Sequence, residues 1–317
     1  MKFQMPRIGI GLWAIGGSQW GSTDDGETLH MIDSALEKGV RFFDTADVYG
    51  DGHSEELLGR AMVGRREKFL VGTKIGWVGF QGDIGSSAYT TTALLIEGVE
   101  SNLRRLKTDY IDLLQSHINF RDPTMEVFLE GFEILKKQGK IRAYGVSTSD
   151  FDYLQAFNQN KGCSTLQVDY SILNRTPEAD CLPYCQEHGI ETIIRGGLAM
   201  GILTDKFTPQ TTFEDNDFRK AWISDPDQNR IFLQDLKTVE QLRAVLSLGP
   251  PGQTMGQLAI RFLLANPGVT TVIPGGKNAR QLTSNLAVLD MPPLSKEEMK
   301  AIDKIVPPKG GRKIWPA

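Results

Sequence analysis

The chain has 317 residues, of which 40% are hydrophobic and 23% charged, the composition of a soluble globular protein. A formal net charge of −4 and the lack of any lysine and arginine run argue against a nucleic-acid-binding protein. No apolar stretch reaches the ~20 residues that cross a bilayer, and residues 1–13 lack the pattern of a signal peptide, so we expect a cytoplasmic protein that does not bind membranes.

Short apolar segments alternate with amphipathic segments along the chain. Strands are predicted at residues 7–13, up to Asp44, and at 69–74, 110–117, 141–146, 165–170, 190–194 and 269–273. Helices are predicted at residues 25–38, 53–62, 91–106, 123–138, 151–158, 177–188, 279–289 and 295–306. Ser54 is placed to cap the second helix. This alternation of strands and helices indicates parallel β/α units.

Eight strands of this kind predict a (β/α)8 TIM barrel that forms a single domain over residues 1–317, with two helices closing the chain. A closed barrel is favoured over an open sheet because polar residues at several strand ends must converge on one mouth. Residues 203–232, after the seventh strand, are polar and show neither the helical nor the strand periodicity of apolar residues. Phe218, Trp222 and Phe232 are isolated apolar anchors in this segment. This segment is predicted to be a lid over the mouth.

Chemically active residues follow three of the strands. Asp44 ends the second strand and Tyr49 follows it in a loop, while Lys74 ends the third strand and His117 ends the fourth. Each residue alone fits a turn or ordinary packing, but carboxyl-terminal strand ends meet at the catalytic mouth of a barrel. The set, with its flanking words Gly-x-Arg-x-Phe-Asp-Thr-Ala-x-x-Tyr-Gly and Asp-Tyr-Ile-Asp-Leu-Leu-x-x-His, resembles the aldo-keto reductases over nearly the whole chain. The words around residues 11–17 and 48–56 look most like the bacterial inositol-utilisation and general-stress subgroup.

The resemblance implies an oxidoreductase that reduces an aldehyde or ketone with a hydride from a nicotinamide cofactor, since no side chain supplies a hydride. Tyr49 would be the general acid, and Lys74 would stabilise the tyrosinate. Asp44 would keep Lys74 charged and oriented, and His117 would bind the substrate oxygen. Trp13 and Trp77 are candidates, with His117, for the wall of the substrate pocket. Sugars, small aldehydes, ketones and aromatic carbonyls all remain candidate substrates.

The resemblance also implies a set of cofactor ligands on the later strands. Ser147, Thr148 and Gln167 would hold the carboxamide, although Thr148 replaces the usual asparagine. Arg195 replaces the usual stacked aromatic residue, so it would stack on the nicotinamide or pair with a phosphate or a lid carboxylate. The complete candidate set is Trp13, Asp44, Ser147, Thr148, Gln167, Arg195, Gly196, Leu198, Gly201, Lys206, Gly275, Lys277, Gln281 and Asn285.

The word Ile-Pro-Gly-Gly-Lys at residues 273–277 is similar to the family's phosphate-binding word. Lys277 is positioned for an adenosine 2′-phosphate, with Arg280 one turn away, so we expect NADP(H) rather than NAD(H), with NAD(H) as the alternative. Gln281 and Asn285 would contact the adenine. No metal is expected. Cys181, Cys185 and His188 are a weak candidate for a zinc site, and the two cysteines are expected to be reduced thiols on a partly buried helix.

A different class of function remains open. Some members of the family are cofactor-binding regulatory subunits of potassium channels, in which turnover is not the output. The lack of an extension before the first predicted strand disfavours a channel-blocking role. A barrel with Schiff-base chemistry would not account for Tyr49. The expected partner is a small-molecule carbonyl compound, and the expected assembly is a monomer or a weak homo-oligomer.

Overall fold

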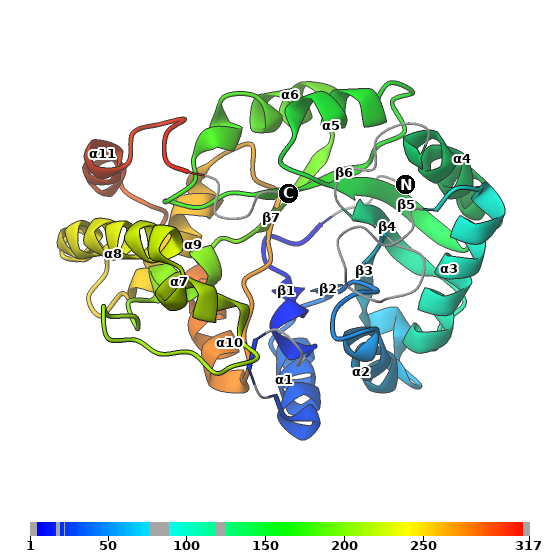
Figure 1. Cartoon of the computed structure of the whole chain (residues 1–317), viewed down its shortest axis with the longest axis horizontal. Coiled ribbons are helices and arrows are strands. Elements are labelled where there is room, and N and C mark those ends of the chain that lie inside the picture. Colours follow the sequence, from blue (N-terminus) through cyan, green and yellow to red (C-terminus); the bar gives the residue numbers. More distant parts are fainter. Residues whose placement is uncertain (1–4, 17–19, 22, 77–88, 118–123, 313–317) are drawn as a thin grey trace.

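The computed structural model describes residues 5–16, 20–21, 23–76, 89–117 and 124–312. Eight parallel strands lie in sequence order in one sheet, and Figure 1 shows them at the centre of a ring of helices. The strands are β1 (Ile10–Gly11), β2 (Phe42–Asp44), β3 (Leu70–Ile75), β4 (Ile111–His117), β5 (Ile141–Ser147), β6 (Thr165–Asp169), β7 (Glu191–Arg195) and β8 (Thr271–Val272). The barrel closes where the Gly9 amide donates to the Val272 carbonyl at 2.9 Å and the Val272 amide donates to the Arg7 carbonyl at 3.0 Å. The predicted (β/α)8 barrel is therefore confirmed.

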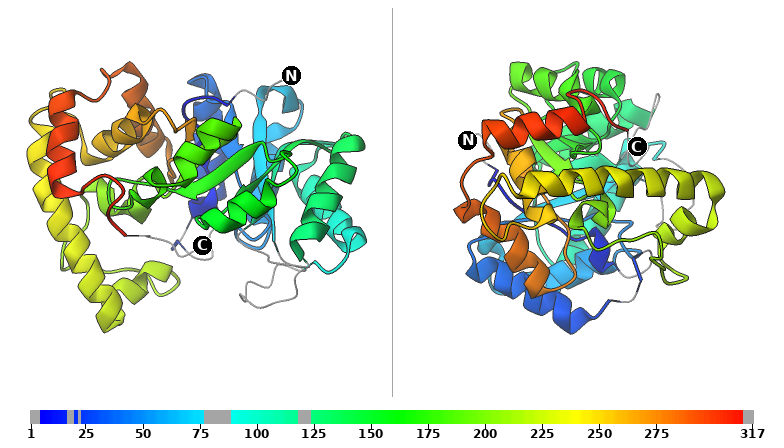
Figure 2. Two further views of the ribbon diagram at one scale, coloured as in Figure 1. Left: turned by 90° about the horizontal axis from the view of Figure 1, so that it is seen from above. Right: turned by 90° about the vertical axis from the view of Figure 1, so that its left-hand side faces the viewer.

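Eight helices of the described residues lie close to predicted spans, and three others, between residues 221 and 265, were not predicted. They are α1 (Asp25–Glu37), α2 (His53–Met62), α3 (Thr92–Leu106), α4 (Thr124–Lys137), α5 (Phe151–Phe157), α6 (Cys181–His188), α7 (Ala221–Ser224), α8 (Pro226–Leu246), α9 (Met255–Ala265), α10 (Ala279–Leu286) and α11 (Lys296–Ile305). In Figures 1 and 2, α8 and α11 lie outermost on one side of the barrel, where they pack against each other. In the described residues, no helix combines the length and apolar character that crossing a membrane requires.

Two apolar clusters form the interior. The larger lies between the strands and the helices, and the smaller joins Met5, Phe42, Leu113, Ala143, Ile193 and Ile273. Side chains two residues apart on a strand point to the same face. Phe42 therefore shares a face with Asp44, Leu113 with Gln115 and His117, and Ile193 with Arg195. The small cluster is the floor of the barrel, and the chemically active side chains lie above it at the mouth.

The irregular segment predicted over residues 203–232 is shorter in the structure, its role as a lid stays a prediction, and the predicted cap at Ser54 was wrong. Residues 226–232 are the first turns of α8, which begins at Pro226. The N-cap of this helix is Asp225, whose side chain accepts a hydrogen bond from the Gln228 amide. The irregular part is therefore confined to about residues 205–217, and α9 was not predicted. Ser54 is not a cap, because the N-cap of α2 is Gly52 with a φ of 90°. The Ser54 hydroxyl instead lies buried, 2.8 Å from Thr45 Oγ1.

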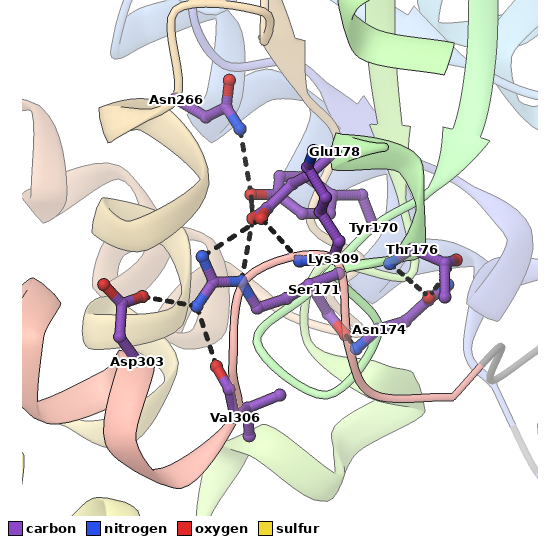
Figure 3. A network of polar contacts seen from close by, with 10 residues as sticks. Tyr170, Ser171, Asn174, Thr176, Glu178, Asn266, Asp303, Val306 and Lys309 are labelled. Atoms are coloured by element: carbon purple, nitrogen blue, oxygen red, sulfur yellow. Dashed lines mark hydrogen bonds and ion pairs between the residues drawn. The ribbon is translucent and has the colours of Figure 1, made fainter. Parts of the chain in front are cut away.

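The segment after α11 is tied to the loop after β6 (Figure 3). The Arg175 guanidinium donates from Nη1 to the Asp303 carboxylate at 2.7 Å and to the Val306 carbonyl at 2.8 Å, and from Nε to Glu178 Oε1 at 2.8 Å. The Lys309 amide donates to Glu178 Oε2 at 3.1 Å. Arg175 is only 4% exposed, so these partners compensate a charge that is largely removed from water.

Candidate active site

Asp44, Lys74 and Tyr49 meet at the mouth of the barrel. Lys74 Nζ donates to Asp44 Oδ2 at 2.8 Å, to the Thr45 carbonyl at 2.8 Å and to Tyr49 Oη at 3.0 Å. These three bonds use all three ammonium donors. Asp44 is also fixed from the opposite side, because Gln167 Nε2 donates to its Oδ1 at 2.7 Å. The geometry therefore brings together the residues predicted for proton transfer.

Burial decides the protonation states in this cluster. Lys74 is fully buried and Asp44 is 2% exposed. Burial alone would lower the pKa of Lys74, but the Asp44 carboxylate and Tyr49 raise it, which keeps the ammonium charged. Burial raises the pKa of Tyr49, against the opposing effect of the Lys74 ammonium, so the phenol is protonated at neutral pH.

The Tyr49 ring is held between two other rings. Trp13 stacks on it at a centroid distance of 6.0 Å, and His117 meets it edge-on at 5.9 Å. Burial, with the neighbouring Lys74 and Arg195 cations, lowers the pKa of His117 well below its usual value. His117 is therefore a neutral imidazole that can share a hydrogen bond with a substrate oxygen beside the Tyr49 hydroxyl.

Asp47, which the sequence patterns did not indicate, links the Tyr49 loop to the end of β3. Its amide donates to the Lys74 carbonyl at 3.2 Å, and its carboxylate accepts from the amides of Val48 at 2.8 Å and Gly76 at 3.3 Å. Burial, together with the nearby Glu55 carboxylate, raises the pKa of Asp47 to about 8. The loop is thereby anchored to the backbone at Lys74 and Gly76.

A cavity of about 440 Å³ runs outward from this cluster. Twelve of the residues predicted to bind a cofactor line it: Trp13, Asp44, Gln167, Arg195, Gly196, Leu198, Gly201, Lys206, Gly275, Lys277, Gln281 and Asn285. Ser147 and Thr148 are buried and are not among the described lining residues. Thr148 Oγ1 accepts a hydrogen bond of 3.0 Å from the Asp150 amide, just before α5. Trp77 lies outside the described residues.

The outer end of the cavity is positively charged. Lys206, Arg219 and Lys277 line it. Burial is the largest cause that lowers the pKa of Lys206, and the charges of Arg219 and Lys277 lower it further. Arg219 is held against Asp217 by two side-chain hydrogen bonds, and Lys277 Nζ donates to the Trp20 carbonyl. Arg280, expected near this position, is exposed. Arg219 was not predicted, because it lies within the segment interpreted only as a lid.

The donor set at this end fits a phosphate-bearing dinucleotide. The cavity passes from three cations to the β8–α10 loop, where Gly275 leaves space, because a Cβ added there would come no closer than 3.9 Å to another atom. Helix α10 begins beside it with Asn278 as its N-cap. Cations and a helix N-terminus favour phosphate, and Gln281 and Asn285 offer amide groups beyond them.

The three thiols are separate from this site. Cys163, Cys181 and Cys185 are free and buried, and burial raises the pKa of Cys163 to about 12. Across the described part of the chain, no three His, Cys, Asp or Glu side chains group in an arrangement that suits a metal ion.

Comparison with known proteins places the chain among reductases. The sequence profile of the aldo/keto reductase family matches residues 7–307. The chain is 36% identical over 308 residues to aldo-keto reductase YhdN of Bacillus subtilis, covering 95% of this chain and 89% of that protein. It is 28% identical to a probable voltage-gated potassium channel subunit beta of Oryza sativa, over 95% of this chain and 92% of that one.

Solved structures agree with the sequence comparisons. The glycerol dehydrogenase AKR11B4 from Gluconobacter oxydans superposes with a TM-score of 0.82 at 32% identity, over 96% of this chain and 92% of that chain. An aldo-keto reductase from Klebsiella pneumoniae, crystallised in complex with NADPH, has a TM-score of 0.72 at 26% identity, over 98% of this chain and 93% of that chain.

Proposed function

The chain belongs to the aldo/keto reductase family, and we propose that it is an NADP(H)-dependent oxidoreductase that reduces an aldehyde or ketone to an alcohol, with Tyr49 as the general acid. The observation that carries this proposal is the hydrogen bond of 3.0 Å from Lys74 Nζ to Tyr49 Oη at the inner end of the cavity. NADPH, when bound, supplies the hydride, and the side chains supply the proton and the electrostatic environment.

The proton moves from Tyr49 Oη to the substrate oxygen as that oxygen gains negative charge. A phenol is a weak acid at neutral pH, so the tyrosinate that remains must be stabilised. The Lys74 ammonium, already hydrogen-bonded to Tyr49 Oη, provides this stabilisation without reorganisation. Asp44 keeps the ammonium charged and directs it, because the pair is 2.8 Å apart and buried.

His117 has a positioning role toward the substrate in this proposal. Its ring meets the Tyr49 ring edge-on, and the lowered pKa keeps it neutral. A neutral imidazole can bind the substrate oxygen and leaves Tyr49 as the proton donor, whereas a protonated imidazole would be the stronger acid of the two. Trp13, stacked on Tyr49, is proposed to form one wall of the substrate pocket. The substrate itself is proposed only as a small-molecule carbonyl compound.

The preference for NADP(H) over NAD(H) rests on the outer end of the cavity. A 2′-phosphate adds a charged group that NAD(H) lacks, and Lys277, Arg219 and Lys206 present cations there. We propose that Lys277 contacts this phosphate after leaving the Trp20 carbonyl, and that Gln281 and Asn285 contact the adenine. The glycine-bearing loop at residues 196–201 is proposed to contact the pyrophosphate.

A regulatory role is the second candidate. The similarity to a probable potassium channel subunit beta favours it. In such a role the same cofactor-binding site would report redox state and turnover would be slow. Steady-state turnover of a panel of aldehydes and ketones with NADPH separates the two, because a regulatory subunit would bind NADPH without rapid multiple turnover.

The test of the catalytic assignment is Tyr49→Phe, which removes one hydroxyl and keeps the ring. We expect reduction of a carbonyl substrate to fall by at least ~10²-fold, the usual scale of general acid catalysis. NADPH affinity, followed by protein fluorescence, should change by less than about threefold, because the predicted phosphate contacts lie at the other end. A variant that kept more than about a tenth of the wild-type turnover would contradict the role of Tyr49.

A further inference from the structure

Gln115 places an uncharged carboxamide inside the barrel, between the apolar floor and the catalytic mouth. It lies on β4 between Leu113 of the floor and His117 of the mouth, and it shares their face. Its side chain is fully buried, and neither Oε1 nor Nε2 has a hydrogen-bond partner among the described residues. Native proteins rarely leave a buried amide in this state, because burial removes the water that would otherwise bond to it.

The height of Gln115 in the barrel follows from the strand pairing. Asp44 pairs with Gly72, and Gly72 pairs with Leu113. Because barrel strands tilt, residues at one height advance by about one position per strand relative to this pairing. Two strands on from Asp44, the residue at its height is therefore Gln115. The same offset over four strands leads to Gln167, which does donate to Asp44 across the barrel. Gln115 thus lies at the level of the bond between Gln167 and Asp44.

A second polar group without a partner lies next to this carboxamide. Gly145 pairs with Gln115 on one side and with Thr165 on the other, so the two side chains flank a residue that has none. Thr165 is also fully buried, and its Oγ1 has no hydrogen-bond partner within the described parts of the chain. This hydroxyl leans over Gly145, because a Cβ added there would collide with it. Two polar groups therefore border the same space inside the barrel.

This space is separate from the cofactor cavity. Asp44 and Gln167 line that cavity and bond to each other at 2.7 Å, whereas neither Gln115 nor Thr165 is among its described lining residues. The backbones of β4 and β6 lie two strand spacings apart, at most about 9.5 Å. A carboxamide and a hydroxyl that face each other across this distance without bonding leave room for one small polar molecule.

We propose that Gln115 and Thr165 bind an internal water molecule beneath the bond between Gln167 and Asp44. Such a water donates to Gln115 Oε1 and accepts a hydrogen bond from the Thr165 hydroxyl, which is the usual way in which buried polar groups are satisfied. Both protein groups are uncharged, so the site suits water and not a bare ion. The proposal depends on the interior of the barrel and not on the proposed reaction.

The first test is a high-resolution crystal structure with and without NADPH. We expect electron density for a water within hydrogen-bond distance of the Gln115 carboxamide and of Thr165 Oγ1. The water should remain when NADPH binds, because the site lies outside the cavity, and in Thr165→Ser, which keeps the hydroxyl. It should be absent from the double variant Gln115→Met with Thr165→Val. A dry gap, a direct bond between the two side chains, or a Gln115 side chain bonded directly to Asp44 would overturn the proposal.

Urea unfolding gives an independent test. Gln115→Met and Thr165→Val each remove hydrogen bonds to the water, so each should raise the equilibrium constant of unfolding by about three- to tenfold. The double variant should raise it by less than the product of the two effects, because both side chains bind the same water. If the two groups were unsatisfied instead, either substitution would remove a destabilising polar group and the constant would fall. A fall in either single variant, or two effects that simply multiply, contradicts the site.

Discussion

Lys74→Met tests the buried ion pair on which the proposed chemistry depends. The substitution keeps an unbranched side chain of similar length and removes the ammonium that bonds to Asp44, Thr45 and Tyr49. Asp44 would then be 2% exposed with the Gln167 amide as its remaining described side-chain donor. An isolated buried carboxylate is strongly disfavoured, so the loss should appear first in stability and not only in activity.

The size of the effect follows from the geometry. Two charges 2.8 Å apart attract by about 6 kcal/mol at an effective dielectric constant of ~20. Desolvation of both groups offsets part of this, and removing one partner of a buried pair usually costs about 3–5 kcal/mol. We therefore expect the free energy of unfolding of Lys74→Met at pH 8 to be lower than that of wild type by about 3–5 kcal/mol.

The deficit should depend on pH in a defined direction. Without Lys74, burial raises the pKa of Asp44 further above its unfolded value of ~3.9, so the folded variant binds a proton that the unfolded chain releases. Stability of the variant then falls as the pH rises from about 4 through the folded pKa. The deficit relative to wild type should be small near pH 4.5 and largest at pH 8.

Urea unfolding followed by tryptophan fluorescence, at pH 4.5 and pH 8, measures this difference. The matched control is the double variant Asp44→Asn with Lys74→Met, which has no buried unpaired charge and should be more stable than the single variant at pH 8 by about 2 kcal/mol. Equal deficits at the two pH values, or a double variant no more stable than Lys74→Met, would refute the reasoning.

Three further predictions concern the rest of the site. Lys277→Ala should reduce the kcat/KM preference for NADPH over NADH by about tenfold, roughly 1.4 kcal/mol; an unchanged ratio would assign the preference to Arg219. Hydrogen exchange of residues 205–217 should slow when NADPH binds, and equal exchange with and without it would rule out a lid. Because the folded-state pKa of Asp47 is about 8, wild type should lose stability as the pH rises from about 4 to 8. Asp47→Asn, tested by urea unfolding, should lose less over this range, and parallel pH profiles would contradict the protonated state of Asp47.

The barrel and its catalytic cluster could be predicted because both depend on local signals. Each strand is a short apolar run, and in a parallel barrel every strand ends at the same mouth. Asp44, Lys74 and His117 are the last or next-to-last residues of their strands, so a pattern of three strands was enough to place them together. Their hydrogen bonds required only that the strands pair in sequence order, which the barrel does.

The lid and Arg219 show where local signals fail. The first turns of α8 are polar because their outward face is exposed, and the first buried residue of this helix is Phe232. The Asp-Pro pair at residues 225–226 was a helix-start signal that the polar composition concealed. Arg219 lies two residues after Asp217, which forms an isolated β-bridge with Trp20. This bridge joins two segments that are distant in the sequence, and neither segment carries a sequence pattern that predicts it.

The closure of the barrel has a consequence for its biosynthesis. Arg7, beside β1, donates to the Val269 carbonyl at 2.6 Å, and the two residues are 262 positions apart. At roughly 5–20 residues per second, a ribosome needs on the order of 13–50 s to make that interval. During this time the outer edge of β1 has no neighbouring strand to pair with, and unpaired edges attract other chains. At two residues, β1 is too short to be an effective template for aggregation, so the brevity of this strand protects the nascent chain until β8 arrives.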